Sequence, residues 1–185
     1  MFRFALIINV PGASLGTCSK VYENKDSYNE FIGSGSMEMA GQIVQSLLEK
    51  DIEEIDLCGA FDDQETEKLR NITQNKIEIF NSKHSPEELR KVKEMNSFNK
   101  YGFISITKGI ETMQSLELLG EKRNNHIILV KDLDMACQAA NMLLENGVDL
   151  IELCSWFDDE KTQSVIDAIN GKIPVGSCGV ALKHI

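Results

Sequence analysis

The same stretch of sequence occurs twice in this chain of 185 residues, 96 positions apart. IDLCGAFDDQET covers residues 55–66, and IELCSWFDDEKT covers residues 151–162. Without any gap, 11 of the 25 residues in 42–66 are identical to their counterparts in 138–162. A repeat of this length that occurs only twice is not a solenoid unit. We therefore expect two fused copies of one small domain, related by a pseudo-twofold axis.

Weaker similarity extends the repeat in both directions, and it places the first copy at residues 1–81 and the second at 100–185. The segment between them, residues 82–99, contains SPEELRKVKEMN. Its Ser85, Pro86 and Glu88 are typical of the first turn of a helix, as cap, first residue and third residue. We expect this segment to form a linker helix between the copies.

Reading the copies side by side predicts one order of elements for both. Apolar runs bounded by turn residues predict strands at 3–10, 29–32, 53–58 and 76–80, and again at 103–107, 126–130, 148–154 and 172–176. Apolar residues at helical spacing predict helices at 36–50, 63–72, 134–146 and 159–169. We expect Ser36 and Asp134 to cap two of these helices, and Gly147 to end one. Residues 19–24 and 115–120 add one further strand to each copy.

This β-α-β-α-β order predicts an α/β fold, because parallel strands need crossover connections that cover the sheet with helices. An alternative is suggested by LLENGVDLIEL at 143–153. It resembles a helix–strand unit of the phosphate-binding (β/α)-barrel aldolases, and this resemblance implies a partial, barrel-like arrangement.

LLENGVDLIELCSWFDDEKTQSVIDAINGKIPVG, residues 143–176, also resembles an uncharacterised family of small bacterial α/β proteins. Members have a VDLIELCGGF-type strand and loop, then a helix, then a GRVPVG-type strand. They open with a strand similar to FALIINVPG at 4–12. A member is about one copy long, so this chain resembles a tandem duplication. Gly59-Ala60 stays close to the Gly-Gly of the family, whereas Ser155-Trp156 departs from it.

Composition narrows the range of partners. The net charge is −10, which argues against nucleic acid and anionic membranes because both would repel the chain. The five cysteines form no C-x-x-C pair and the three histidines share no metal-ligand spacing, so we expect no metal site. No apolar run approaches the length of a membrane helix. We expect a cytoplasmic protein with free thiols, and self-association stays open.

The ends of the central strands hold the first candidate site. Cys58 and Cys154 end these strands, and Asp62 and Asp158 follow at the start of the next helices. Ligands of open parallel sheets bind beyond such strand ends. A thiol beside a carboxylate could act as a nucleophile or an acid/base pair. A structural role fits better, because cysteine is often buried, aspartate often caps helices, and carboxylates raise a thiol pKa.

The second candidate site binds an anion through the GSGSM segment, which runs from a strand end to a helix start. Its bare amides and hydroxyls could hold a phosphate or carboxylate. The counterpart KDLDM segment, residues 131–135, places Asp132 and Asp134 there, which would repel an anion. A serine-capped helix explains the same residues. The ligand-binding candidates are Gly33, Ser34, Gly35 and Ser36.

The leading functional hypothesis is the binding of a small anionic metabolite at strand C-termini, with or without catalysis. The alternatives are a non-enzymatic interaction or scaffold module, and a barrel-like lyase or isomerase. A closed pocket holding Cys58 and Gly33–Ser36 favours the first, and a filled core favours the second. The sequence identifies neither a substrate nor a cofactor.

Overall fold

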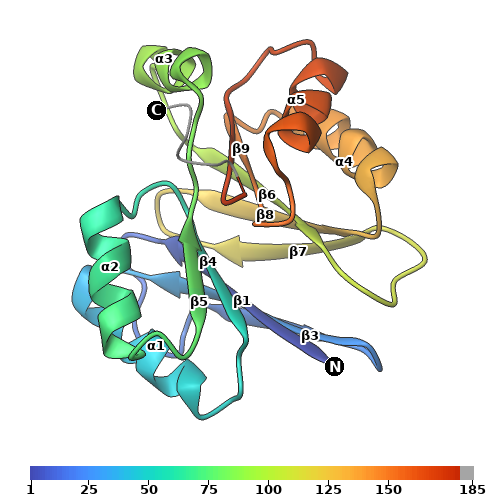
Figure 1. The fold of residues 1–185 in the computed structure, drawn as a ribbon. Helices are drawn as coiled ribbons and strands as arrows, with labels where there is room; N and C mark the ends of the chain where they lie inside the picture. The colour runs from blue at the N-terminus through green and yellow to red at the C-terminus, as the bar shows by residue number, and fades with distance from the viewer. Residues whose placement is uncertain (180–185) are drawn as a thin grey trace.

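The computed structural model describes residues 1–179 and shows two halves with the same order of elements (Figure 1). The first half contains β1 (Phe2–Asn9), β2 (Ser19–Glu23), β3 (Ser27–Ser34), α1 (Met37–Leu48), β4 (Glu54–Leu57), α2 (Asp63–Ile72) and β5 (Glu78–Asn81). The second half contains β6 (Lys100–Ile106), β7 (Gln114–Leu119), β8 (Asn124–Val130), α4 (Leu133–Glu145), β9 (Leu150–Leu153), α5 (Asp159–Ala168) and β10 (Val175–Ser177). Helix α3 (Pro86–Glu94) connects the two halves along the chain, with Ser85 as its N-cap.

Each half forms one open five-stranded sheet, in the orders β2-β3-β1-β4-β5 and β7-β8-β6-β9-β10. Only β2 and β7 run antiparallel to their neighbours, and each pairs with the strand that follows it. The expected α/β fold with two similar halves is confirmed. The strands form two separate sheets and not the barrel-like alternative, and one antiparallel bridge between Lys83 and Ser177 connects the segment after β5 with β10.

Helices cover only one face of each sheet. Figure 1 shows α1 and α2 outside the first sheet, α4 and α5 outside the second, and the two sheets between them. Residues alternate along each strand between these two faces, so neighbouring side chains have different surroundings. In β1 both faces are apolar enough to bury Phe4–Ile8, which explains the continuous apolar run in the sequence. In β4 Ile55 and Leu57 form an apolar face, and the other face carries Glu54 and Asp56.

The helix ends follow the sequence expectations with one exception. Ser36 caps α1 by accepting from the Met39 N–H, and Gly147 has the expected positive φ of 73° after the end of α4. The prediction that Asp134 caps α4 is wrong, since Asp132 has the extended backbone of a cap and accepts from the Met135 N–H. Asp134 instead lies in the first turn, where its charge complements the helix dipole. No helix within residues 1–179 is long and apolar enough to cross a membrane.

The halves contact each other through a reciprocal pair of hydrogen bonds. The buried carboxylate of Asp56 on β4 accepts from the Ser155 N–H at 2.9 Å. The buried carboxylate of Glu152 on β9 accepts from the Gly59 N–H at 3.0 Å. Acceptors and donors are each 96 positions apart, so each half gives and receives the same contact. This is the pattern of a twofold-related interface.

Candidate functional site

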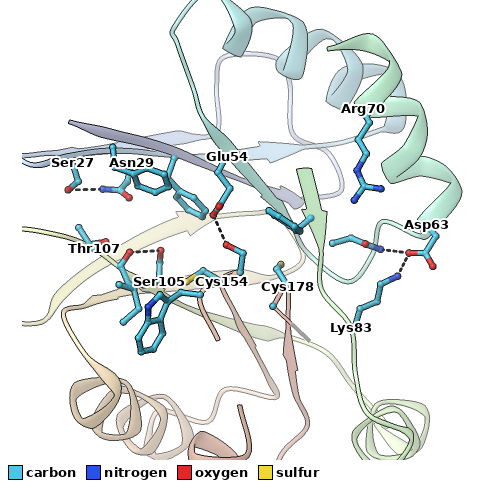
Figure 2. A pocket seen from close by; sticks show the side chains of 18 of the residues that line it. Ser27, Asn29, Glu54, Asp63, Arg70, Lys83, Ser105, Thr107, Cys154 and Cys178 are labelled. Carbon is cyan, nitrogen blue, oxygen red and sulfur yellow. Dashed lines mark hydrogen bonds and ion pairs between the residues drawn. The ribbon is translucent and has the colours of Figure 1, made fainter. Parts of the chain in front are cut away.

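A cavity of about 1120 Å³ opens between the two halves, and Figure 2 shows it from close by. The part between the sheets is what we call the inter-sheet cavity. The first half lines it from the starts of β1, β3 and β4 with Phe2, Phe4, Ser27, Asn29 and Glu54. The second half lines it from the ends of β6 and β9 with Ser105, Ile106, Thr107, Cys154, Ser155 and Trp156.

A second part of the cavity lies beyond the edge strand β5 and is charged. Asp63 and Arg70 reach it from α2, and Lys83 reaches it from the segment after β5 (Figure 2). Lys83 forms an ion pair with Asp63, and the Arg70 guanidinium donates to the Ile79 carbonyl. Burial lowers the pKa of Lys83. These charges are therefore held by neighbours within the protein.

The inter-sheet cavity holds polar groups that the protein leaves open. Thr107 is 2% exposed, and its hydroxyl has no hydrogen-bond partner among the residues that the structure describes. A buried hydroxyl without a partner is unfavourable, so this position suits a polar group of a ligand. Asn29 is also buried, and its amide nitrogen makes only a long contact of 3.4 Å to the Ser27 hydroxyl.

Glu54 is the carboxylate of the inter-sheet cavity. It accepts a hydrogen bond from the Ser155 hydroxyl of the other half. Burial raises the pKa of Glu54, the Ser155 hydrogen bond opposes this, and the charges of Glu78 and Glu53 raise it further. Burial next to other carboxylates thus favours its neutral form, and a cationic partner would favour its charged form.

Aromatic rings form much of the remaining wall: Phe2, Phe4, Phe80 and Trp156. Trp156 is 43% exposed and lies edge-on to Phe157, with ring centroids 5.0 Å apart. Apolar walls with a few directed polar groups are typical of pockets that bind small organic molecules.

The equivalent place in the other half is filled by an arginine. Asn125 pairs with Tyr101 across β8 and β6, as Asn29 pairs with Phe4 across β3 and β1. Arg123 lies two residues before Asn125, and its guanidinium carbon is 4.4 Å from the ring centroid of Phe98. We call this place the Arg123 site.

The guanidinium of Arg123 makes three further contacts in the Arg123 site. Its carbon is 5.6 Å from the Tyr101 ring centroid, and its Nε donates to Asn125 Oδ1 at 3.2 Å. Its Nη2 donates to the Asn9 carbonyl at the end of β1. A planar cation therefore lies against aromatic rings and donates to two oxygen acceptors.

A comparison with models of protein families shows to which family the chain belongs. One family model matches it twice, at residues 2–97 and 99–184. The chain belongs to the family of unknown function DUF6506. The double match agrees with the tandem duplication read from the sequence. The quoted strand motifs of the resembled family are not tested by it.

Other comparisons add nothing to this DUF6506 chain. No curated protein matches it. An NtrC family transcriptional regulator from Clostridium acetobutylicum is 12% identical, with 96% of this chain and 87% of that one covered and a TM-score of 0.29. An ABC transporter periplasmic solute binding protein from Actinobacillus succinogenes 130z, solved with bound D-allose, is 13% identical, with 95% and 77% covered and a TM-score of 0.28. Both TM-scores are too low to support an argument.

The thiols predicted from the sequence lie in equivalent places. Cys58 accepts from the Asn9 N–H and Cys154 from the Ile106 N–H, but only Cys154 lines the cavity. Burial raises the pKa of each thiol to about 12, with Glu152 adding to the effect on Cys58. Both are neutral near pH 7 and are poor nucleophiles in this state.

The predicted carboxylates lie in different surroundings from the thiols. Asp62 and Asp158 are exposed and cap α2 and α5. The structure therefore combines a buried thiol and an exposed cap in each half, and a catalytic role for these four residues stays a prediction. Among residues 1–179, no group of three or more histidine, cysteine, aspartate or glutamate side chains is arranged to hold a metal ion.

The GSGSM segment leads from β3 into α1, as expected, but its polar groups have partners. The Ser34 hydroxyl donates to the Ser36 carbonyl, and the Ser36 hydroxyl accepts from the Met39 N–H. A Cβ added to Gly33 would lie 2.6 Å from Cys18 Sγ, and one on Gly35 would lie 2.6 Å from the Ala13 carbonyl oxygen. Close packing of the preceding loop explains both glycines, and an anion site here stays a prediction.

Sequence reasoning missed Asn29, Glu54 and Thr107 as site residues. A usable signal was present at the offset of 96, where Ser27 stands against Arg123 while Asn29 stands against Asn125. His84 is mostly buried against Glu152, with Nε2 3.9 Å from Oε1. His184 lies outside the described residues.

Proposed function

We propose that the inter-sheet cavity binds a small organic molecule with a planar, apolar body. The observation that carries this proposal is a cavity with aromatic walls and a buried hydroxyl, on Thr107, that lacks a partner within the described chain. The whole cavity, of which the inter-sheet cavity is one part, has a volume of about 1120 Å³, and sites for drug-sized ligands hold roughly 300–1,000 Å³. The space between the halves is open, which supports a binding function over a pure scaffold.

Binding has better support than nucleophilic catalysis. Two thiols line the cavity, Cys154 and Cys178. Burial raises the pKa of Cys154 to about 12 and that of Cys178 well above its ordinary value, and Asp56 adds to both effects. A thiolate is the reactive form, so these residues are suited to packing and weak hydrogen bonding. A cytoplasmic location, self-association and the lack of nucleic-acid and membrane partners remain proposals that rest on composition.

The test is a fragment library titrated into the protein and followed by backbone amide shifts. Trp156 is the single tryptophan of the chain and lines the cavity, so its fluorescence reports binding independently. We expect hits with planar apolar bodies to shift the amides of Asn29 and Thr107 and to change this fluorescence. Hits that shift only residues away from the cavity would contradict the proposal.

A blocking variant follows from the other half. Ser27→Arg places an arginine where Arg123 lies in the second half, and we expect it to abolish the response of Trp156 to every cavity ligand. Ser19→Arg is the matched control, because Ser19 is exposed on the edge strand of the same sheet. If Ser27→Arg does not fold, the amide and fluorescence data on the unmodified protein decide the proposal alone.

A further inference from the structure

We infer that the inter-sheet cavity selects a planar, hydrogen-bond-donating cation, such as an amidinium or guanidinium group on an apolar body. This inference rests on the proposed function and gives the ligand its chemical class. Its basis is the Arg123 site, where the protein fills the equivalent place of the second half with its own guanidinium group.

The acceptors that Arg123 uses have counterparts in the cavity. Asn125 Oδ1 corresponds to the side-chain oxygen of Asn29, which lines the cavity. The Asn9 carbonyl corresponds to the Ile106 carbonyl, because both residues end the first strand of a half and donate their N–H to the equivalent cysteine. Ile106 also lines the cavity.

The aromatic surface is repeated as well. Tyr101, which packs against the Arg123 guanidinium, corresponds by register to Phe4. Phe4 lines the cavity, with Phe2 two residues before it on the same face of β1. A planar cation over such rings gains a cation–π attraction that strengthens where water is excluded. The cavity therefore offers the surroundings of Arg123 without the arginine.

One substitution between the halves favours a cation further. Glu54 pairs with Phe4, whereas the equivalent partner of Tyr101 is Leu150. The open half thus has a carboxylate where the filled half has an apolar side chain. A carboxylate and a planar cation form charge-assisted hydrogen bonds, which are stronger than neutral ones. An anionic ligand would meet repulsion at the same position.

Basic residues at the cavity do not reverse this preference. Lys108 is exposed, and its amine lies 5.8 Å from the Phe2 ring centroid at the rim. Solvent and salt screen such an exposed charge. Lys68 and Arg70 belong to α2, and Lys83 follows β5. Lys68 is exposed, Lys83 is paired with Asp63, and Arg70 is paired with Glu67.

The test uses three compounds of nearly one shape: benzamidine as the cation, benzamide as the neutral form and benzoate as the anion. Each is titrated into the unmodified protein near pH 7, with Trp156 fluorescence and amide shifts as readouts. We expect benzamidine to bind about tenfold more tightly than benzamide, as a charge-assisted hydrogen bond implies, and benzoate to bind most weakly.

Glu54→Gln supplies the residue-level test, because it keeps the shape and removes the charge. We expect it to weaken benzamidine binding about tenfold and to leave benzamide binding unchanged. The matched control is Glu78→Gln, which removes an exposed carboxylate from the neighbouring position on β5.

The outcomes separate this inference from the proposed function. If benzamide or benzoate binds as tightly as benzamidine and shifts the cavity amides, the charge preference is overturned and the binding function stands. If neither these compounds nor any library fragment shifts the cavity amides, both are overturned. Should Glu54→Gln fail to fold, the ranking of the three compounds on the unmodified protein decides.

Discussion

Asp56 accepts a hydrogen bond from the backbone N–H of Ser155, a residue of the other half, at 2.9 Å. Ser155 also donates its hydroxyl to Glu54, which lies two residues before Asp56 on the same face of β4. Ser155 therefore belongs both to the contact that joins the halves and to the wall of the cavity. A change at this contact acts on stability first and on the cavity through Ser155.

Asp56→Asn should remove the part of the pH dependence of the unfolding free energy that comes from the Asp56 carboxyl group. Burial raises the pKa of Asp56 well above its ordinary 3.8, and the Glu54 charge adds to this. The unfolded chain therefore loses the proton first as pH rises, so Asp56 stabilises fully below about pH 4 and progressively less above it. The slope is at most about 1.4 kcal/mol per pH unit.

Urea unfolding of both proteins from pH 4 upward measures this difference. The stability of the unmodified protein relative to Asp56→Asn should fall as pH rises toward the raised pKa. Asp134→Asn, at an exposed position in α4, is the control and should follow the unmodified protein. Parallel stability curves for Asp56→Asn and the unmodified protein would contradict the raised pKa.

Leu153→Ala should destabilise the protein by roughly 2–5 kcal/mol, because it leaves a cavity in a buried strand. Leu57 and Leu153 are both 0% exposed. Leu57→Ala should behave alike, since it lies at the equivalent position. Leu119→Ala is the control, with 67% of the leucine exposed, and should change denaturant midpoints little.

Gly35→Ala should destabilise by about 1–3 kcal/mol through overpacking, because the new methyl group would press on the Ala13 carbonyl oxygen at 2.6 Å. Gly41→Ala is the matched control within α1, where the nearest atom is the mobile end of Ile72 at 3.2 Å and alanine favours the helix. Thermal unfolding of both variants without added anions compares them. Equal midpoints would mean that packing does not explain Gly35, and would favour the predicted anion site.

The repeat predicted most of the fold because it let each element be read twice. Strands such as β4 and β9 have the same apolar pattern and the same cysteine after them, so local sequence was sufficient. The cavity was beyond local reading. Glu54 and Thr107 belong to different halves, and only the facing of the two sheets brings them to one space. No spacing within either segment encodes that arrangement.

The positions at which the two copies differ are informative about the cavity, and the positions at which they agree are not. Ser155-Trp156 against Gly59-Ala60 was recognised, and both serine and tryptophan line the cavity. The difference between Ser27 and Arg123 was not recognised. A serine near a strand indicates no site by itself, and only the structure shows that Arg123 fills the equivalent place of the second half. At this position the copy with the small residue, Ser27, is the one that stays open, and Ser27 lines the cavity.

Arg123→Ser should open a second binding place. The substitution removes the guanidinium group that contacts Phe98, Tyr101 and Asn125, and it leaves a cavity with the shape of the removed side chain. Methylguanidinium at millimolar concentration should then raise the melting temperature of the variant more than that of the unmodified protein. Methylurea, its neutral counterpart, should not. Equal shifts in both proteins would show that the Arg123 site does not select a planar cation.

Benzamidine affinity should rise with pH through the raised pKa of Glu54. Burial is the largest cause of that rise above the ordinary 4.5, the Ser155 hydroxyl opposes it, and the carboxylates of Glu78 and Glu53 add to it. Asp56, Cys154 and Cys178 are also ionisable and lie near this end of the cavity, and burial raises the pKa of all three. Benzamidine stays cationic over this range and prefers ionised Glu54, so binding releases one proton below the pKa. The dissociation constant should therefore fall by at most about tenfold per pH unit and then level off. Trp156 fluorescence titrations at a series of pH values measure this curve. Glu54→Gln should flatten it, whereas Glu78→Gln should keep the pH dependence and shift it to lower pH, because it removes a charge that raises the pKa of Glu54. A flat curve for the unmodified protein would show that Glu54 does not contact the cation.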